Sequence, residues 1–244
     1  MLTAEQRQAQ QELKRIVHKT GHVVFFGGAG VSTESGIPDF RSSNGLWNQN
    51  YRYPPEQVVS HSFFKAHPDA FYEFYRAKML FPNAQPNAAH RRLASLEREG
   101  LLDAVVTQNI DGLHQKAGSR NVIELHGSTL RNYCMDCKAP YSLEFVAQGP
   151  GLPRCTACGG LVRPDVVLYE EALDEQVIRR AVAAISQARV LICAGTSLSV
   201  YPAAGFLQYF QGDTLAVINL SPTALDARAD LLIPAKVGEV MDWD

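Results

Sequence analysis

The sequence predicts an α/β protein built on a doubly wound parallel sheet, with a smaller zinc-ribbon and helical insertion domain. Four short apolar segments are typical of buried strands, and each runs directly into a polar or glycine-rich loop. Patterns with helical spacing lie between these segments, so strand and helix alternate. Two Cys-x-x-Cys pairs interrupt the alternation. Ligands of such sheets bind outside the carboxyl ends of the strands, so we expect the four loops to converge on one crevice.

The first two elements are a helix and a strand. Thr3 and Gln6 have the spacing of a capping box, and apolar residues then recur at helical spacing up to Gly21. Residues 22–26 form a short apolar run that ends in Gly27-Gly28-Ala29-Gly30. This is the pattern of a buried strand that enters a glycine turn.

The alternation continues along the rest of the chain. Three more strands are expected at residues 104–107, 190–194 and 215–218, with helices at 87–99 and 174–188. Residues 42–85 are rich in aromatic residues, Pro and Asn, and residues 134–160 carry the cysteine pairs. These two stretches are the predicted insertions.

The composition excludes several classes of protein. The 244 residues are 46% hydrophobic and 20% charged, which is typical of a chain that folds by itself. A formal charge of −2 gives no general attraction to nucleic acid or to an anionic membrane. The apolar runs are shorter than the roughly 20 residues that span a bilayer. No signal peptide is recognisable, so we expect a cytoplasmic monomer.

The cysteine pairs predict a structural zinc site. Cys134 and Cys137 form one pair, Cys155 and Cys158 form the other, and 17 residues lie between the pairs. This spacing is expected of a four-cysteine zinc ribbon, in which two turns direct four thiolates at one ion. Cys193 lies in an apolar run and is expected to be a small core residue.

The glycine turn after the first strand only partly matches a dinucleotide-binding fingerprint. Gly28 and Gly30 are present, but Thr33 stands where the third glycine is expected. Backbone N–H groups of such a turn can still bind a pyrophosphate, and Pro38 prevents one regular helix from following.

Several motifs together indicate a family. Six segments resemble the motifs of the sirtuin family in their order, namely Gly28-Ala29-Gly30-Val31-Ser32, Gly36-Ile37-Pro38-Asp39-Phe40-Arg41, Gln108-Asn109-Ile110-Asp111, Leu125-His126-Gly127, Gly195-Thr196-Ser197 and Asn219-Leu220-Ser221. The resemblance runs from about residue 23 to the C-terminus, and its motif set is most similar to the compact bacterial branch. It implies an NAD-dependent protein-lysine deacetylase that releases nicotinamide and O-acetyl-ADP-ribose and acts on acetyl-lysine proteins or peptides.

The resemblance also implies the site residues. It places His126 as the catalytic base and Asn109 as the residue that holds the ribose and a water. It assigns Asp111 to the nicotinamide carboxamide and Phe40 to the cover of the reacting ribose. The full set implied for the cofactor is Gly28, Ala29, Gly30, Thr33, Ile37, Asp39, Phe40, Arg41, Gln108, Asn109, Ile110, Asp111, His126, Gly195, Thr196, Ser197, Asn219, Leu220, Ser221 and Val237.

The position of His126 can also be judged from its neighbours in the sequence, and three other polar residues are expected to have structural roles. His126 follows an apolar run at residues 122–125 and precedes Gly127, so we expect an imidazole at a strand end with little steric cover. His114 is expected to be a structural hydrogen-bonding residue. Glu34 and Asp39 are expected to fix their loop by hydrogen bonds.

The resemblance implies that the substrate peptide adds as a strand between residues 166–170 and 197–201, beside Val167, Tyr169 and Val200. Glu170 stands where the family has glycine, which predicts a preference for basic neighbours of the target lysine. Lys78 follows Tyr75 where sirtuins that prefer succinyl groups have arginine, so deacetylation is the expected activity.

Two structural units are expected. Residues 1–43, 86–133 and 161–244 form a Rossmann-like NAD-binding domain, while 44–85 and 134–160 form the small domain. Two other functions stay open, namely removal of another acyl group from lysine and transfer of ADP-ribose to a protein or to water. A non-enzymatic zinc-bearing NAD sensor is disfavoured because His126, Asn109 and Asp111 are all present. A nucleic-acid-binding zinc ribbon is disfavoured by the charge of −2.

Overall fold

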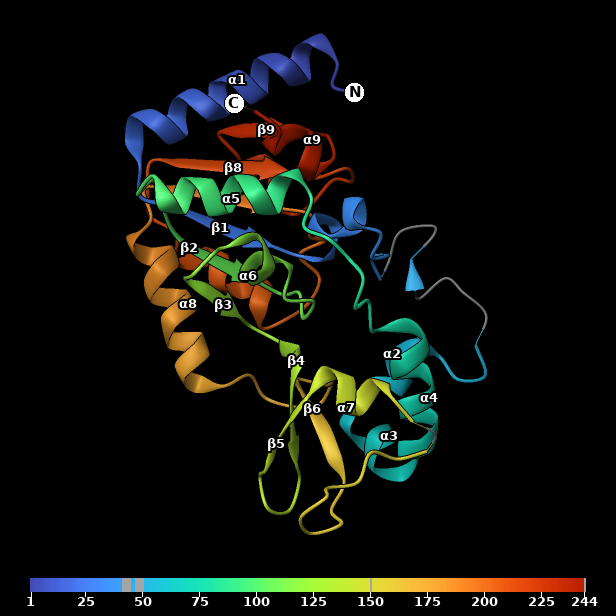
Figure 1. Cartoon of the computed structure of the whole chain (residues 1–244). Coiled ribbons are helices and arrows are strands. Elements are labelled where there is room, and N and C mark those ends of the chain that lie inside the picture. The colour runs from blue at the N-terminus through green and yellow to red at the C-terminus, as the bar shows by residue number, and fades with distance from the viewer. Residues whose placement is uncertain (41–44, 47–50, 150, 244) are drawn as a thin grey trace.

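The computed structural model describes residues 1–40, 45–46, 51–149 and 151–243. In that part of the chain the larger of two sheets has six strands in the order β3-β2-β1-β7-β8-β9, and all neighbouring pairs are parallel (Figure 1). The strands of this sheet are β1 (Val23–Gly27), β2 (Leu102–Thr107), β3 (Val122–Glu124), β7 (Val190–Ala194), β8 (Thr214–Ile218) and β9 (Leu231–Ile233). Numbered within this sheet alone, the order is 3-2-1-4-5-6, which is the order of a Rossmann-type doubly wound fold.

Helices cover both faces of the larger sheet. On one face, α1 (Ala4–Thr20), α5 (Ala88–Arg98) and α9 (Val237–Met241) share one core with alternate strand residues. On the other face, α8 (Glu175–Gln187) and the 3-10 helix η4 (Ala203–Tyr209) share a second core. A short helix, α6 (Leu113–Ala117), follows β2. The predicted two-sided layering is therefore confirmed.

The elements with strong apolar periodicity were predicted correctly. The capping box of α1 is present, because Thr3 Oγ1 accepts from the N–H of Gln6 and the Gln6 side chain accepts from the N–H of Thr3. The helices expected at 87–99 and 174–188 are α5 and α8, capped by Asn87 and Asp174. The predicted strands correspond to β1, β2, β7 and β8.

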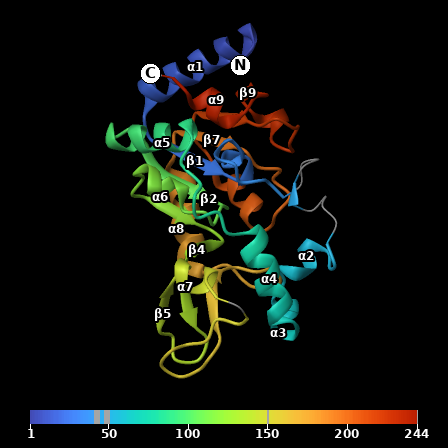
Figure 2. The same ribbon diagram turned by 45° about the vertical axis from the view of Figure 1, so that its right-hand side comes forward.

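The smaller sheet was not predicted in detail. It is antiparallel, in the order β5-β4-β6, and consists of β4 (Gly127–Cys134), β5 (Pro140–Ser142) and β6 (Val162–Val166). Four short helices lie around it (Figure 2), namely α2 (Pro55–Val58), α3 (His61–Ala66), α4 (Pro68–Lys78) and α7 (Leu143–Ala147). Its core is largely aromatic and includes Phe64, Phe71, Tyr72 and Tyr75.

Two 3-10 helices follow β1, namely η1 (Ala29–Val31) and η2 (Thr33–Ser35), and another, η5 (Asp226–Arg228), precedes β9. β4 begins shortly after β3 and pairs with β6, so residues 127–134 and 162–166 extend from the larger sheet into the smaller one. None of the helices formed by the described residues has the length and apolar character needed to cross a bilayer. The division of the chain into two domains at the expected boundaries stays a prediction.

Candidate active site

The site lies where the strand order reverses. β1 and β7 are neighbours in the sheet, and their carboxyl ends carry the glycine turn at Gly28 and the loop that begins at Gly195. The N–H of Gly30 donates to the carbonyl of Gly195 over 2.8 Å, and the N–H of Gly28 donates to the carbonyl of Ala194 over 3.2 Å. The two loops therefore meet backbone to backbone at the switch point, where doubly wound sheets bind their ligands.

This contact explains the glycines. A Cβ atom at Gly28 would lie 2.8 Å from the carbonyl oxygen of Gly195, and one at Gly30 would lie 2.8 Å from the Cα of Gly195. Gly195 itself has φ +59°, and its Cβ would lie 2.5 Å from the backbone nitrogen of Val31. All three positions therefore require glycine, for lack of space and, at Gly195, for backbone conformation.

A polar network joins the glycine turn to the loop after β2. The Ser32 hydroxyl is 1% exposed and donates to Asp111 Oδ2 over 2.6 Å. Asn109 Nδ2 donates to the same hydroxyl oxygen over 3.1 Å. Asp111 Oδ1 accepts from the N–H of Leu113 over 2.9 Å. The sequence did not reveal the hydrogen bond between Ser32 and Asp111, because no local pattern reports a contact between residues 79 positions apart.

The environment of Asp111 tunes its carboxyl group. Burial raises the pKa of Asp111, while the hydrogen bonds from Ser32 and Leu113 act in the opposite direction. The carboxylate is thus a fixed acceptor in surroundings of low dielectric, where a hydrogen bond to a polar ligand is strengthened.

His126 lies in the turn between β3 and β4. Its Nδ1 is 2.9 Å from the carbonyl oxygen of Gln108, and because a carbonyl only accepts, Nδ1 carries the proton. In the neutral imidazole, Nε2 therefore holds the free lone pair. Burial lowers the pKa of His126, and the bond to Gln108 opposes that shift. The expectation of little steric cover was wrong, because the side chain is partly buried.

His126 also connects to the smaller sheet through its backbone. The carbonyl of His126 accepts from the N–H of Val167 over 3.0 Å. The next residue, Gly127, has φ +75°, and a Cβ there would lie 2.0 Å from the carbonyl oxygen of Asp165. The turn that presents the imidazole is therefore closed tightly against the end of β6.

The remaining predicted cofactor residues surround the same edge of the sheet. Gln108 Nε2 donates to Thr196 Oγ1 over 3.1 Å, which joins the loops after β2 and β7. Asn219 follows β8, and its Nδ2 donates to the carbonyl of Ser221 over 2.7 Å. Val237 is buried at the start of α9. Leu220 and Ser197 are exposed.

The other predicted cofactor residues lie in the glycine turn, in the loop that follows it and in the loop after β2. Thr33 is exposed, and its hydroxyl donates to the carbonyl of Gly30 over 3.0 Å. The carbonyl of Ile110, in the loop after β2, accepts from the N–H and the hydroxyl of Thr129, which fix that loop. Arg41 lies outside the residues that the structure describes. The half-buried members of the predicted set in this loop are Ala29, Ile37, Asp39 and Phe40.

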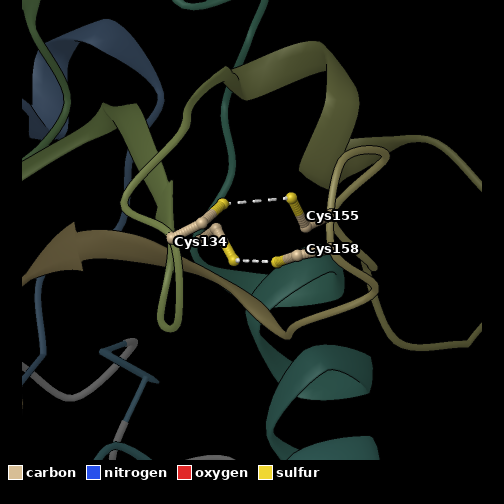
Figure 3. A group of neighbouring side chains, drawn as sticks. Cys134, Cys155 and Cys158 are labelled. Atoms are coloured by element: carbon tan, nitrogen blue, oxygen red, sulfur yellow. Dashed lines mark hydrogen bonds between the residues drawn. The ribbon is translucent and has the colours of Figure 1, made fainter.

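Four thiols form a compact cluster in the smaller sheet. The Sγ atoms of Cys134, Cys137, Cys155 and Cys158 all lie within 4.8 Å of one another. The pairs Cys134–Cys158 and Cys137–Cys155 are 3.5 and 3.6 Å apart (Figure 3). Zn–S bonds of about 2.3 Å in a tetrahedron give S–S edges of about 3.8 Å. The cluster fits a closed structural zinc site.

In the segment that follows β6, the backbone groups of Tyr169 are hydrogen-bonded, whereas one carbonyl has no backbone partner among the described residues. Tyr169 donates its N–H to the carbonyl of Val59, and its carbonyl accepts from the N–H of His61, both over 3.0 Å. Within the described residues, the carbonyl of Val167 has no backbone hydrogen-bond partner. Glu170 has φ +75°, and its carboxylate accepts two hydrogen bonds from Ser62, each over 2.9 Å. Val200 is half-buried in the loop after β7.

Two buried histidines, His90 and His114, lie against each other, and His114 differs from the prediction. His114 was expected to form hydrogen bonds, but neither of its ring nitrogens has a partner among the described residues. Its ring centroid lies 4.7 Å from that of His90. Burial lowers the pKa of His114 and lowers that of His90 to about 4. Both are neutral core residues.

Comparison with known proteins agrees with this arrangement. A Rossmann-type sheet with a glycine turn at its switch point, a partly buried histidine beside it and a closed four-thiol cluster define a nucleotide-binding α/β protein with a zinc-ribbon insertion. Residues 28–202 match the Sir2 family. The chain belongs to this family.

Individual relatives match over almost the whole chain. An NAD-dependent protein deacetylase of Clostridium perfringens is 59% identical over 233 residues, which cover 94% of this chain and 96% of that protein. A Sir2 variant solved with a deacetylated p53 peptide and 3'-O-acetyl ADP ribose is 39% identical, with a TM-score of 0.87 and 95% of each chain covered. A Sir2 homolog in complex with NAD is 42% identical, with a TM-score of 0.85, covering 95% of this chain and 91% of that one.

Proposed function

We propose that this protein is an NAD-dependent protein-lysine deacetylase. Acetyl-lysine, NAD and water are converted to lysine, nicotinamide and O-acetyl-ADP-ribose. The observation that carries the proposal is the Nδ1–H bond from His126 to the Gln108 carbonyl. It fixes a neutral base next to the loop that holds Asn109 and Asp111, on a chain that belongs to the Sir2 family.

The dinucleotide is held across the switch point. The bare backbone at Gly28 and Gly30 lets a pyrophosphate approach, and Thr196 and Asn219 lie at the ends of the neighbouring strands. When bound, NAD supplies the ADP-ribosyl group that accepts the acetyl group. Thr33, Phe40 and Arg41 are proposed on the nicotinamide side, and Ser197 and Val237 on the adenosine side.

The loop after β2 orients the leaving group. Asp111 accepts from the carboxamide N–H₂ of nicotinamide, since its carboxylate is already fixed by Ser32 and Leu113. Asn109 orients the ribose through its side-chain amide, which Ser32 also holds. Positioning of this kind lowers the barrier because the groups need no reorganisation during the reaction.

His126 acts as the general base at Nε2. The atom would accept the proton of a ribose hydroxyl and so make that oxygen a nucleophile toward the acyl group of the substrate. Since burial lowers the pKa of His126, the imidazole is neutral and ready to accept a proton at physiological pH. Phe40 is proposed to exclude water from the reacting carbon.

The zinc ion is proposed to be structural. Cys134, Cys137, Cys155 and Cys158 complete a tetrahedral shell with no position for water or substrate, so the metal supplies folding free energy and no chemistry. The thiols need a reducing compartment, which supports a cytoplasmic location. We further propose a monomer in which residues 44–85 and 134–160 form the small domain.

The substrate peptide is proposed to lie beside Val167, Tyr169 and Val200. Its backbone bond is expected at the carbonyl of Val167, since both backbone groups of Tyr169 are already bonded to Val59 and His61. The available carbonyl of Val167 supports strand addition, which recognises backbone more than sequence. Because the N–H of Val167 is bonded to the carbonyl of His126, the bound lysine is brought next to the base.

One experiment separates the candidate functions. An acetyl-lysine peptide is incubated with the protein and NAD, and products are separated by mass. O-acetyl-ADP-ribose together with free lysine supports deacetylation. ADP-ribose attached to protein or released by water would indicate a transferase or a hydrolase, and no nicotinamide release would indicate an NAD sensor.

A further inference from the structure

Glu34 joins two parts of the chain that are far apart in sequence. It lies in η2, shortly after the glycine turn, and its Oε2 accepts from the N–H of Gly238 over 2.6 Å. Gly238 is the second residue of α9, whose first residue is Val237. The bond therefore ties the loop after β1 to the C-terminal helix, across 204 positions of sequence.

Position 238 leaves no space for a side chain while Glu34 makes this contact. A Cβ there would lie 2.6 Å from Oε2, 2.8 Å from Cδ and 2.8 Å from Oε1 of Glu34. No other atom is nearer, and Gly238 is not among the residues with positive φ. Glycine is thus needed at this position to admit the Glu34 carboxylate, and not for its backbone freedom.

Helix α9, which contains the hydrogen-bond partner of Glu34, is held by contacts of its own. Gln10 is 7% exposed, and its side-chain amide donates to the carbonyls of Glu239 and Val240 over 3.1 and 2.9 Å. Val237 and Val240 are buried in the core that α9 shares with α1 and α5. The α9 helix is therefore a rigid anchor for a loop that lies at the surface.

The loop is held from a second side as well. Asn87 Nδ2 donates to the carbonyl of Val31 over 2.7 Å and to the hydroxyl of Ser35 over 3.0 Å. Asn87 and Glu34 thus fix the loop against α5 and α9, while Ser32 fixes its inner side against Asp111. These contacts hold residues 31–35 from three sides.

We propose that Glu34 is a positioning residue for NAD, and this inference rests on the proposed function. Its bond to Gly238 holds the loop that carries Ala29 and Thr33 against the helix that carries Val237, so both ends of the dinucleotide site are preformed. A preformed site binds more tightly, because the ligand does not have to order the loop. Glu34 itself contacts no reacting atom.

The test is a double-mutant cycle on the full chain, with Glu34→Ala, Gly238→Ala and the double variant. NAD affinity is measured by calorimetry, and kcat and KM for NAD and for an acetyl-lysine peptide are measured separately. Each single change is expected to weaken NAD binding about five- to tenfold through loss of a charged hydrogen bond. The double variant is expected to bind about as well as either single variant, because both changes remove the same contact.

Further readouts separate positioning from general destabilisation. The peptide KM and the kcat at saturating NAD are expected to stay within about twofold. Glu34→Gln keeps an acceptor for the N–H of Gly238 and is expected to restore most of the NAD affinity. Glu175→Ala is the matched control, because that exposed carboxylate on α8 pairs only with Arg179 among the described residues.

Two results would overturn the inference. Losses that add in the double variant would show that the two residues act separately. Unchanged NAD affinity in Glu34→Ala, with only a lower melting temperature, would show a purely structural role. If the unsubstituted protein binds NAD but releases no nicotinamide with any acyl peptide, the proposed function fails while the positioning role is still measured by binding.

Discussion

Replacing Gly195 with alanine should separate the two loops that form the nucleotide site. The new Cβ would lie 2.5 Å from the backbone nitrogen of Val31 and 2.7 Å from the carbonyl carbon of Gly30. These are backbone atoms that cannot rotate away. The loops must therefore move apart by about 0.9 Å to reach an ordinary contact of 3.4 Å.

Two costs add at this position. In Gly195→Ala, the left-handed backbone conformation should lower the free energy of unfolding by about 1–2 kcal/mol. The close contacts of the new Cβ should lower it by about 1–3 kcal/mol more. Gly36 is a matched control, because its φ is +81° and no atom lies within 4 Å of the place that a Cβ would occupy there. Gly36→Ala should therefore show the first cost only.

The assay is thermal unfolding together with NAD affinity for both variants. At roughly 2–4 °C per kcal/mol for a chain of this size, Gly195→Ala should melt about 2–12 °C below Gly36→Ala. Its NAD affinity should fall at least about tenfold, since the Gly30–Gly195 hydrogen bond is broken. Equal melting temperatures and equal affinities in the two variants would refute the role assigned to the backbone contact.

Four further predictions concern the site and the small sheet. His126→Ala should abolish deacetylation with NAD affinity kept within a few fold. In the parent protein burial lowers the pKa of His126, so the midpoint of the fall of kcat/KM with decreasing pH should lie below the ordinary histidine value of about 6.5, and a midpoint above that value would contradict the assignment. Asp111→Asn should cost about 1–2 kcal/mol of transition-state stabilisation and weaken inhibition by nicotinamide, and an unchanged inhibition constant would remove Asp111 from that pocket. Cys158→Ala should lose both zinc and solubility, whereas a folded, metal-free and active variant would contradict a structural metal. An acetyl peptide should be cleaved with higher kcat/KM than its succinyl counterpart. Lys78→Arg should raise desuccinylation above that of the parent protein, because the ammonium of Lys78 lies over the Tyr51 ring and lacks the planar fork of arginine.

Sequence patterns predicted the larger sheet because its central strands are buried on both faces. β1 and β7 consist of five buried residues each, so they read as continuous apolar runs. β9 was missed because it has three residues, one of them exposed. β4 was missed because polar residues alternate irregularly along it, and its pairing with β6 is interrupted between Ser128 and Asn132.

The sequence could name candidate site residues but not the hydrogen bonds that orient them. The motifs named His126, Asn109 and Asp111, but the hydrogen bonds that orient them involve the Ser32 hydroxyl and the Gln108 carbonyl. A side-chain contact over 79 positions and a backbone acceptor leave no local pattern. The same reason hid the pair of His90 and His114, whose ring contact depends on how α5 packs against α6.

His126 links the two halves of the proposed reaction through opposite ends of one residue. Its ring is oriented by the carbonyl of Gln108, in the loop that carries Asn109 and Asp111. Its own carbonyl accepts from Val167, in the segment proposed to bind the peptide. A change in the peptide segment therefore acts directly on the backbone that presents the base. We infer that substitutions at Val167 that shift this segment should lower kcat as well as raise the peptide KM, because they displace Nε2 from the position proposed for it next to the ribose.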